Sequence, residues 1–255
     1  MRIRLFLDKP LHESAAAYYE EAKEVRKKAK GVEEAIEQTK KELKEHQKKK
    51  EEQKKQIRIK AEKKWFEKFH YFMTSGNRMA IGGRNAQQND LVFSKHMDSK
   101  DLFFHADIQG GTALIVKDGT TAMEKELKEC AQFAASFSKA WDNANAMVDV
   151  YSVKKEQLSK HAHGGYIPAG AFAIIGRREW YRNTPLGLRI GMFNGQVTVV
   201  PECSEIRLNG EVLLKPSKTG EEKGKLAKTL ARKFVVHADE LLEILPNGKS
   251  KSRSQ

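Results

Sequence analysis

Long apolar runs and cysteines are scarce in this chain of 255 residues. No stretch reaches about 18 consecutive apolar residues, so we expect no transmembrane helix. The two cysteines, Cys130 and Cys203, form neither a CxxC pair nor a Cys/His spacing typical of a metal site, which favours free thiols in a reducing compartment. The opening segment MRIRLFLDKP lacks the long apolar segment and the cleavage site of a signal peptide. These absences predict a cytoplasmic protein without a membrane partner.

Motifs for nucleotide hydrolysis and metal binding are also missing. The sequence contains neither GxGxxG nor GxxxxGK[ST], the glycine-rich patterns that hold nucleotide phosphates. His161 and His163 lie close together in the chain, but a zinc site usually needs three or four ligands. We therefore expect neither a metal nor another cofactor.

Positive charge is in excess. The chain has 47 Lys and Arg against 34 Asp and Glu, which gives a net charge of +13 and a pI near 9.5. A polyanion such as RNA is a plausible partner, because each phosphate that a basic side chain neutralises releases counterions. The alternative is a Lys- and Glu-rich surface of the kind that thermophilic proteins carry. Charge alone does not decide between the two.

Residues 1–64 are predicted to form a short strand, RIRLFLD, followed by a basic helical arm. Residues 21–64 hold 17 Lys or Arg and 10 Asp or Glu, with one glycine and no proline, and good helix formers dominate. One helix from about Ser14 to Phe69 would be roughly 80 Å long. A hairpin that folds back near residues 46–54 is the alternative.

A thin apolar seam runs along this arm. Its members follow heptad spacing: Val25, Ala29, Val32, Ile36 and Leu43. Such a seam is too narrow to bury a core by itself. It therefore predicts a helical partner, either a second copy of the chain or an N-terminal region outside this sequence.

The fold class that we expect is α+β, with the helical arm followed by a mixed α/β globular module rich in strands. The module should span residues 65–246, and residues 247–255 should form a disordered basic tail. The predicted strands are Arg78–Gly83, Leu91–Phe93, Leu102–Ala106, Thr112–Lys117, Val148–Val153, Ala171–Ile175, Leu186–Met192 and Gln196–Val200, with two short ones in Ile206–Leu214. The predicted helices are Thr121–Ala140, Glu221–Phe234 and Asp239–Leu245.

The string IGGRNAQQND (Ile81–Asp90) combines backbone freedom with polar side chains. Gly82 and Gly83 allow a tight turn or a close approach to a ligand. Arg84 offers a planar fork suited to phosphate. Gln88 and Asn89 can bind base edges. The alternative is an exposed hairpin turn whose polar residues only cap it.

The string DLFFHADIQGG (Asp101–Gly111) contains a buried-looking strand that ends in His105 and Asp107. These two residues could act as an acid/base pair, which would make the protein a hydrolase. However, the sequence places no nucleophile near them. The alternative, which we prefer, is that His105 and Asp107 fix a turn or contact RNA, while Gly110 serves the backbone.

Basic residues accompany glycines and aromatic rings further along the chain. Lys160 precedes a glycine-rich loop that ends at Gly170, which suits a close approach to phosphate. Arg177, Arg178 and Arg182 surround Trp180 and Tyr181, and arginines beside aromatic rings are typical of proteins that bind looped or single-stranded RNA. An edge strand with a solvated basic face is an equally good interpretation of IIGRREWYR. The basic run Lys215–Lys233 is most simply solvated surface.

Taken together, these strings resemble the NFACT RNA-binding module of the ribosome quality-control factors called NEMF in eukaryotes and RqcH in bacteria. The resemblance rests on WFEKF, IGGRNAQQND, DLFFHADIQGG, VYSVKKEQLSK and GAFAIIGRR in this order, and AAAYYEEAKEVRKKAKGVEEAIEQTKKEL is similar to the family's middle coiled coil. The C-terminal strings look like an archaeal-type extension. The family pattern falls on Gly82, Gly83, Arg84, Gln88, Asn89, Asp101, His105, Ala106, Asp107, Gly110, Ser159, Lys160, Gly170 and Gly176. One departure is Gly111, where the family usually has alanine.

The resemblance implies an adaptor that binds RNA and has no catalytic activity. Its partners would be the large ribosomal subunit, its rRNA and tRNA, on complexes that carry stalled nascent chains. Full-length family members also have an N-terminal domain that this sequence lacks, and we expect that domain to be a separate chain or to have been removed. The predicted RNA contacts are Arg84, Gln88, Asn89, His105, Asp107, Lys160, Arg177, Arg178 and Arg182, and the predicted structural glycines are Gly82, Gly83, Gly110 and Gly170.

Two other functions remain as alternatives. A coiled-coil scaffold would explain the arm but not the strings of the module. A hydrolase would use His105 and Asp107, but the sequence supplies no nucleophile, no metal ligand set and no phosphate-binding loop.

Overall fold

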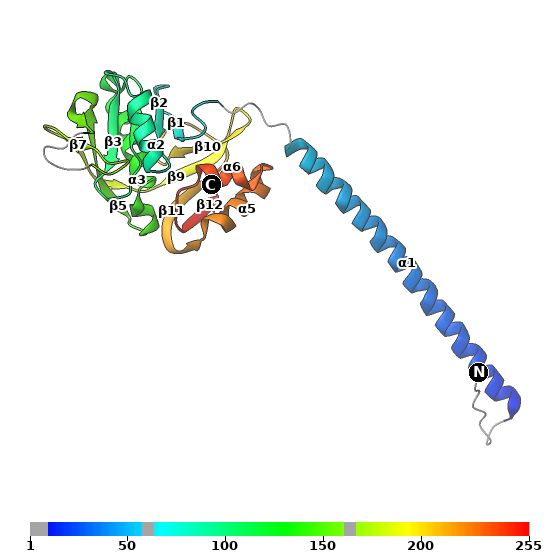
Figure 1. Ribbon diagram of the computed structural model, residues 1–255. Coiled ribbons are helices and arrows are strands. Elements are labelled where there is room, and N and C mark those ends of the chain that lie inside the picture. The colour runs from blue at the N-terminus through cyan, green and yellow to red at the C-terminus, as the bar shows by residue number, and fades with distance from the viewer. Residues whose placement is uncertain (1–9, 58–63, 161–166, 255) are drawn as a thin grey trace. The chain divides into compact units, whose positions relative to one another are not determined.

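The computed structural model describes residues 10–57, 64–160 and 167–254 (Figure 1). The chain divides into two units, residues 1–59 and 60–255. The predicted strand RIRLFLD and the pair His161 and His163 lie outside the described residues. No helix in the described part of the chain is long and apolar enough to cross a membrane.

The first unit contains a single helix, α1 (Leu11–Ile57), of 47 residues. At 1.5 Å per residue its length is about 70 Å. One continuous helix is therefore confirmed against the hairpin. The predicted end at Phe69 is wrong, because residues 65–68 form turns and Phe69 is fully buried in the second unit. Aromatic side chains in this segment gain more from burial in a core than from an exposed helix.

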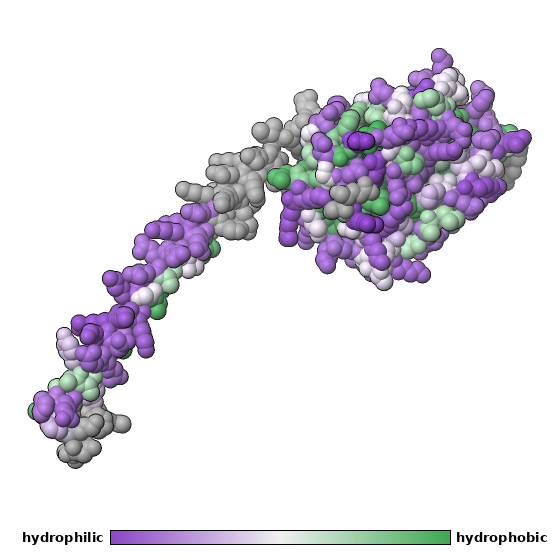
Figure 2. Space-filling view, turned by 180° about the vertical axis from the view of Figure 1, so that it is seen from behind, coloured by the Kyte–Doolittle hydropathy of each residue, from purple (hydrophilic) through white to green (hydrophobic). Residues whose placement is uncertain are grey.

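The apolar seam of α1 has no partner among the described residues. Val25, Val32, Ile36 and Leu43 are 48–59% exposed. Figure 2 shows the helix as a mostly hydrophilic surface that a few hydrophobic side chains interrupt. The residues of this helix have high helix propensity, which favours a helix even where no core covers it. The seam leaves apolar area that a second helix would cover.

The second unit is a strand-rich module that also contains helices, as predicted. Its helices are α2 (Ala86–Leu91), α3 (Glu124–Ser136), α4 (Lys139–Asp142), α5 (Lys223–Phe234) and α6 (Ala238–Ile244). Short helical turns cover Val92–His96, Gly119–Thr121 and Lys155–Gln157. Its strands are β1 (His70–Met73), β2 (Met79–Gly82), β3 (Leu102–Ala106), β4 (Leu114–Val116), β5 (Met147–Lys154), β6 (Leu158–Ser159), β7 (Ala173–Ile174), β8 (Glu179–Pro185), β9 (Leu188–Phe193), β10 (Gln196–Pro201), β11 (Asn209–Glu221) and β12 (Ser250–Ser254).

The strands form two main antiparallel sheets. The larger has the order β1-β2-β4-β3-β5-β8, and the smaller has the order β10-β9-β11-β12, while β6 and β7 pair separately. Strand β8 is an edge of the larger sheet. An edge strand is one of the two interpretations of the string IIGRREWYR, and the position of β8 agrees with it, while the function of its basic residues stays a prediction.

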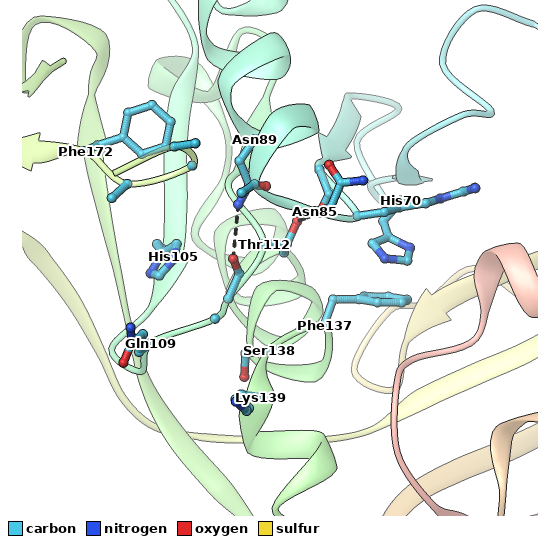
Figure 3. A pocket seen from close by; sticks show the side chains of 18 of the residues that line it. His70, Asn85, Asn89, His105, Gln109, Thr112, Phe137, Ser138, Lys139 and Phe172 are labelled. Carbon is cyan, nitrogen blue, oxygen red and sulfur yellow. Dashed lines mark hydrogen bonds between the residues drawn. The ribbon is translucent and has the colours of Figure 1, made fainter. Parts of the chain in front are cut away.

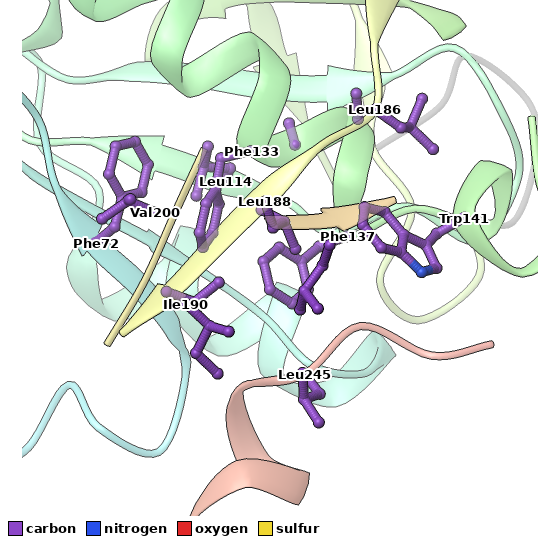
Figure 4. Close-up of a cluster of buried hydrophobic side chains, with 14 of the residues drawn as sticks. Phe72, Leu114, Phe133, Phe137, Trp141, Leu186, Leu188, Ile190, Val200 and Leu245 are labelled. Atoms are coloured by element: carbon purple, nitrogen blue, oxygen red, sulfur yellow. The ribbon is translucent and has the colours of Figure 1, made fainter. Parts of the chain in front are cut away.

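Both faces of the larger sheet are covered. Consecutive side chains of a strand point to opposite faces. Accordingly Phe103 of β3 packs with Ile115 and the helical turn at Val92, whereas Phe104 packs with Phe133 of α3. Figure 4 shows the cluster on the Phe104 side, where α3 meets the smaller sheet through Leu188, Ile190 and Val200. A hydrophobic cluster therefore packs on each face of the larger sheet and supports the loops at the ends of its strands.

Two local predictions are wrong, and both involve residues 85–93. The predicted strand Leu91–Phe93 is helical, and the predicted hairpin turn at Ile81–Asp90 becomes the start of α2. The side chain of Asn85 accepts a hydrogen bond from the backbone N–H of Gln88 at 2.9 Å, which satisfies an N–H group that α2 leaves unpaired. Val92 is then buried from a helical turn instead of a strand.

The predicted disordered tail is also wrong for residues 250–254. These residues form β12, which pairs with β11 at the edge of the smaller sheet. The indole Nε1–H of buried Trp141 donates a hydrogen bond to the Ser250 hydroxyl at 3.0 Å. A polar segment is ordered here because a free strand edge and a buried donor both need a partner.

Candidate nucleic-acid interface

A pocket of about 660 Å³ opens on the module beside the end of β3 (Figure 3). Four segments supply most of its lining. They are the loop between β2 and α2, the loop after β3, the start of α4 and the segment 168–172. Figure 3 shows His105, Gln109, Lys139 and His70 around this space, with Asn85 and Asn89 above. The pocket therefore brings together residues from several of the strings that the sequence singled out.

The loop after β2 lies against its neighbours without space for larger residues. A Cβ atom on Gly83 would lie 2.3 Å from Oδ1 of Asn89, and one on Gly82 would lie 2.5 Å from the Thr112 hydroxyl. Asn89 is buried, and its side chain accepts from the backbone N–H of Ala113 at 3.0 Å. Both glycines thus permit a close approach of backbone segments.

Arg84 and Gln88 hold this loop in place. The Arg84 guanidinium donates to the carbonyl oxygens of Glu67 at 2.8 Å and Phe69 at 3.1 Å. It also lies 3.6 Å from the Glu243 carboxylate. The Gln88 amide accepts from the backbone N–H of Arg84 and donates to the carbonyl of Lys68. These predicted RNA contacts therefore already bind protein atoms.

His105 forms part of the pocket wall. Its ring is parallel to that of Phe103 at 6.2 Å, and it faces Tyr151 at 5.9 Å. Burial lowers the pKa of His105 below its ordinary value, although nearby backbone groups and Asp107 oppose that effect. The ring is therefore a neutral, flat surface near neutral pH. The side chain of Asp107 is exposed. Its backbone N–H donates a hydrogen bond to the backbone carbonyl of Asp149 at 2.7 Å.

Asp101 lies at the other end of β3 and is fully buried. It accepts hydrogen bonds from the backbone N–H groups of Asp98 and Asp118 and forms an ion pair with Lys117 at 2.5 Å. Burial alone would lower the pKa of Lys117, but the carboxylates of Asp101 and Asp98 raise it above its ordinary value. Asp101 thus holds in place the loops that flank the strand, and its carboxylate oxygens bind protein groups.

Lys160 and Gly170 both contact Asp90 of α2. The Lys160 ammonium contacts the Asp90 carboxylate and lies 3.9 Å from the ring centroid of Phe172. The backbone N–H of Gly170 donates to the same carboxylate at 3.0 Å. Gly170 has a φ of +78°, and a Cβ there would lie 2.6 Å from Ala86. This position requires glycine on both counts.

A group of arginines and aromatic rings lies next to the pocket. We call it the arginine–aromatic ridge, and it consists of Tyr151, Arg178, Trp180 and Arg182. The Arg178 guanidinium lies 4.7 Å from the ring of Tyr151, and that of Arg182 lies 3.9 Å from the ring of Trp180. Tyr151 also lines the pocket, so the two surfaces are continuous. Arg177 is exposed on the segment just before β8.

Asp149 orients one end of the ridge. The backbone N–H of Asn183 and the Arg182 guanidinium hold the pKa of Asp149 below its ordinary value. The Arg182 contact is 2.5 Å long. Over half of the Arg182 side chain remains exposed, so its guanidinium is positioned and still accessible.

Sequence analysis missed several polar residues of the pocket, among them His70, Asn85, Gln109 and Lys139. His70 stacks on Phe137 at 4.1 Å, and its Nδ1 atom is buried without a hydrogen-bond partner. Burial, then the charges of Arg84 and Lys223, keep the pKa of His70 well below its ordinary value. His70 and Lys139 lie far apart in the sequence, so no local pattern could have joined them.

The comparisons with known proteins agree with this architecture. Residues 68–176 match the family model described as "NFACT protein RNA binding domain". The chain therefore carries an RNA-binding domain of the NFACT type, and the resemblance found in its motifs is confirmed.

Curated relatives are similar to parts of the chain. The chain is 40% identical over 201 residues to the "Archaeal Rqc2 homolog aRqcH" of Methanocaldococcus jannaschii, which covers 75% of this chain and 30% of that protein. It is 38% identical over 138 residues to the "Ribosome quality control complex subunit NEMF homolog" of Drosophila melanogaster, covering 52% of this chain and 14% of that one. It thus spans less than a third of these relatives. A structure of the C-terminal part of the fibronectin/fibrinogen-binding protein from Streptococcus suis aligns with a TM-score of 0.40 and 26% identity, covering 50% of this chain and 49% of that one.

Proposed function

We propose that this chain is an RNA-binding adaptor of ribosome quality control that acts in the cytoplasm. Its partners would be tRNA and the rRNA of the large ribosomal subunit on complexes with stalled nascent chains. The NFACT-type RNA-binding domain supports this proposal, as does similarity to proteins named as subunits of the ribosome quality control complex. The observation that carries it is the continuity of the pocket with the arginine–aromatic ridge.

The chemistry of this surface suits unstacked nucleotides. Proteins that recognise RNA loops and ends stack bases on aromatic rings and guanidinium planes. The ridge offers both, and the pocket volume of about 660 Å³ lies within the range of about 300–1,000 Å³ that small-ligand sites have. Asn85 and Gln109 supply amide groups at the pocket. The loops and the acceptor end of a tRNA present bases in this form.

The proposal includes a helical partner for α1. The seam of the helix is exposed along its length, and a second helix would bury it. An N-terminal region of a longer protein and a second copy of the chain are the two candidates.

A comparison of two double variants tests the RNA surface. Arg178→Ala with Arg182→Ala removes both guanidinium planes of the ridge. We expect the ridge variant to weaken binding of a tRNA transcript and of a short single-stranded RNA by about tenfold or more at about 0.1 M salt, because charge and stacking are lost together. Filter binding measures both affinities.

The matched control is Lys100→Ala with Lys154→Ala, which removes the same charge from exposed positions outside the ridge. Its affinity should stay close to that of the unaltered protein. If the ridge variant binds both RNAs as tightly as this control does, the proposed surface is wrong.

A further inference from the structure

A second basic surface lies outside residues 68–176, which match the RNA-binding domain. It is helix α5 (Lys223–Phe234), whose sequence KGKLAKTLARKF contains five cations and no acidic residue. The arm helix α1 also contains many lysines, but acidic residues lie among its cations. In Figure 1, α5 lies beside α6 and the strand β11. The charge of α5 is therefore concentrated instead of balanced.

The two faces of α5 are distinct. Leu226, Leu230 and Phe234 are buried against the module and fix the helix on it. Lys225, Lys228 and Arg232 are exposed on the other side. Their spacing of three and four residues places them in one row about 10 Å long.

The cations of this row are not committed to protein partners. Among the described residues, no ion pair involves Lys225, Lys228 or Arg232. Lys223 differs, because it donates to Asn247 at 2.9 Å, and burial lowers its pKa below the ordinary value. Glu222, just before the helix, pairs with Lys249 at 3.0 Å. The exposed row thus offers free positive charge on a rigid element.

We propose that the exposed face of α5 binds the phosphate backbone of duplex RNA. This proposal rests on the proposed function, because it takes RNA as the partner. The α5 sequence has only one aromatic residue, Phe234, and that ring is buried, so the exposed face offers no aromatic ring on which a base could stack. A row of cations without stacking surfaces binds phosphates irrespective of sequence. The ridge and α5 would then bind different parts of the RNA: the ridge would bind unpaired nucleotides, and α5 would bind a paired segment.

The test replaces the row by Lys225→Ala, Lys228→Ala and Arg232→Ala. Alanine favours the helix, so the fold should persist, which circular dichroism and thermal unfolding check. We expect the affinity for a blunt duplex RNA to fall by one to two orders of magnitude at about 0.1 M salt. The slope of log K against log salt should also become shallower by about two to three, since roughly 0.9 is lost for each phosphate contact.

Two control variants separate the effect of α5 from a general loss of charge and from the effect of the ridge. Lys27→Ala, Lys30→Ala and Lys41→Ala on α1 removes the same charge, and it should leave duplex affinity unchanged. The ridge variant Arg178→Ala with Arg182→Ala should lose single-stranded binding and keep most duplex binding. If the ridge variant retains its single-stranded affinity while the α5 variant loses duplex binding, the proposed function fails at the ridge and α5 still stands.

Three outcomes would overturn the assignment of α5. One is unchanged duplex affinity in the α5 variant. Another is an equal loss in the α1 variant, which would show a general charge effect. The third is competition by poly-glutamate as strong as that by duplex RNA at equal charge, which would show that the surface binds any polyanion.

Discussion

Single polar side chains in the module mainly hold its loops in position. Arg84, Gln88 and Asn89 were predicted to contact RNA, yet their polar groups bind protein carbonyl and N–H groups. The carboxylate of Glu126 also binds protein groups. Burial alone would raise the pKa of Glu126. Hydrogen bonds from Thr74, Met123 and Arg78 outweigh that effect and keep the pKa of Glu126 below its ordinary value. The accessible polar groups, such as Arg178 and Lys139, are the ones left for a ligand.

His70 should make the stability of the module depend on pH. Its pKa in the folded protein lies well below 6.5, so the unfolded chain binds a proton that the folded chain does not. As the pH falls below about 6.5, the free energy of unfolding should therefore decrease, by up to about 1.4 kcal/mol per pH unit, until the pH reaches the folded pKa. His70→Phe keeps the stacking on Phe137 and cannot be protonated. It should lose less stability than the unaltered protein between about pH 7 and pH 5.

Denaturant unfolding across this range measures the effect. His237→Asn provides the control, because His237 is exposed and asparagine retains a capping group for α6. The carboxylates with lowered pKa values, such as Glu126, act only below about pH 4.5, so they do not disturb this window. A His70→Phe protein with the same pH slope as the unaltered chain would contradict the role given to His70.

Among the elements, α1 is the one that most clearly needs a partner helix, because its apolar seam is exposed. Val32→Lys with Ile36→Lys places two charges in the seam and should abolish association with a helical partner. Sedimentation of the chain alone tests a second copy, and sedimentation with an N-terminal fragment of a related protein tests the other candidate. We expect the mass to increase with concentration or with fragment, and the variant to remain monomeric.

Ala35→Lys with Gln38→Lys is the matched control, because it adds the same charge to α1 outside the seam. It should associate as the unaltered chain does. A chain that is monomeric at every concentration and binds no such fragment would show that the seam has no helical partner.

For the whole molecule, we expect RNA binding without turnover of its own. Burial raises the pKa of the Cys130 thiol well above its ordinary value, and partial desolvation raises that of the more exposed Cys203 to about 11, so neither thiol is ionised at neutral pH. His105 is a wall residue, and Asp107 is exposed beyond the strand end. His105→Ala should therefore lower RNA affinity or stability and change no hydrolytic rate.

Nuclease, phosphatase and peptidase assays on the unaltered protein and on His105→Ala measure this directly. Asp107→Asn serves as a second variant, and thermal unfolding verifies that each protein is folded. An activity that purifies with the unaltered chain and disappears in His105→Ala, with fold and RNA affinity intact, would favour the hydrolase over the adaptor.

The sequence by itself determined the elements whose signals are local. Helix formers without proline specify α1, and the short apolar string Leu102–Ala106 specifies β3, because propensity and burial pattern act over a few residues. The order of the motif strings also sufficed to indicate an NFACT-type RNA-binding domain.

Only the tertiary structure decided which polar residues remain available to a ligand. Arg84 binds the carbonyls of Glu67 and Phe69 because β1 and β2 are adjacent, and His70 faces Phe137 because α3 packs on the sheet. The polar segment Ser250–Ser254 becomes a strand because β11 has a free edge and Trp141 needs an acceptor. Each of these contacts joins residues 15 to 109 positions apart. Hydrogen bonds of that range depend on how the chain packs, and no pattern within one segment encodes them.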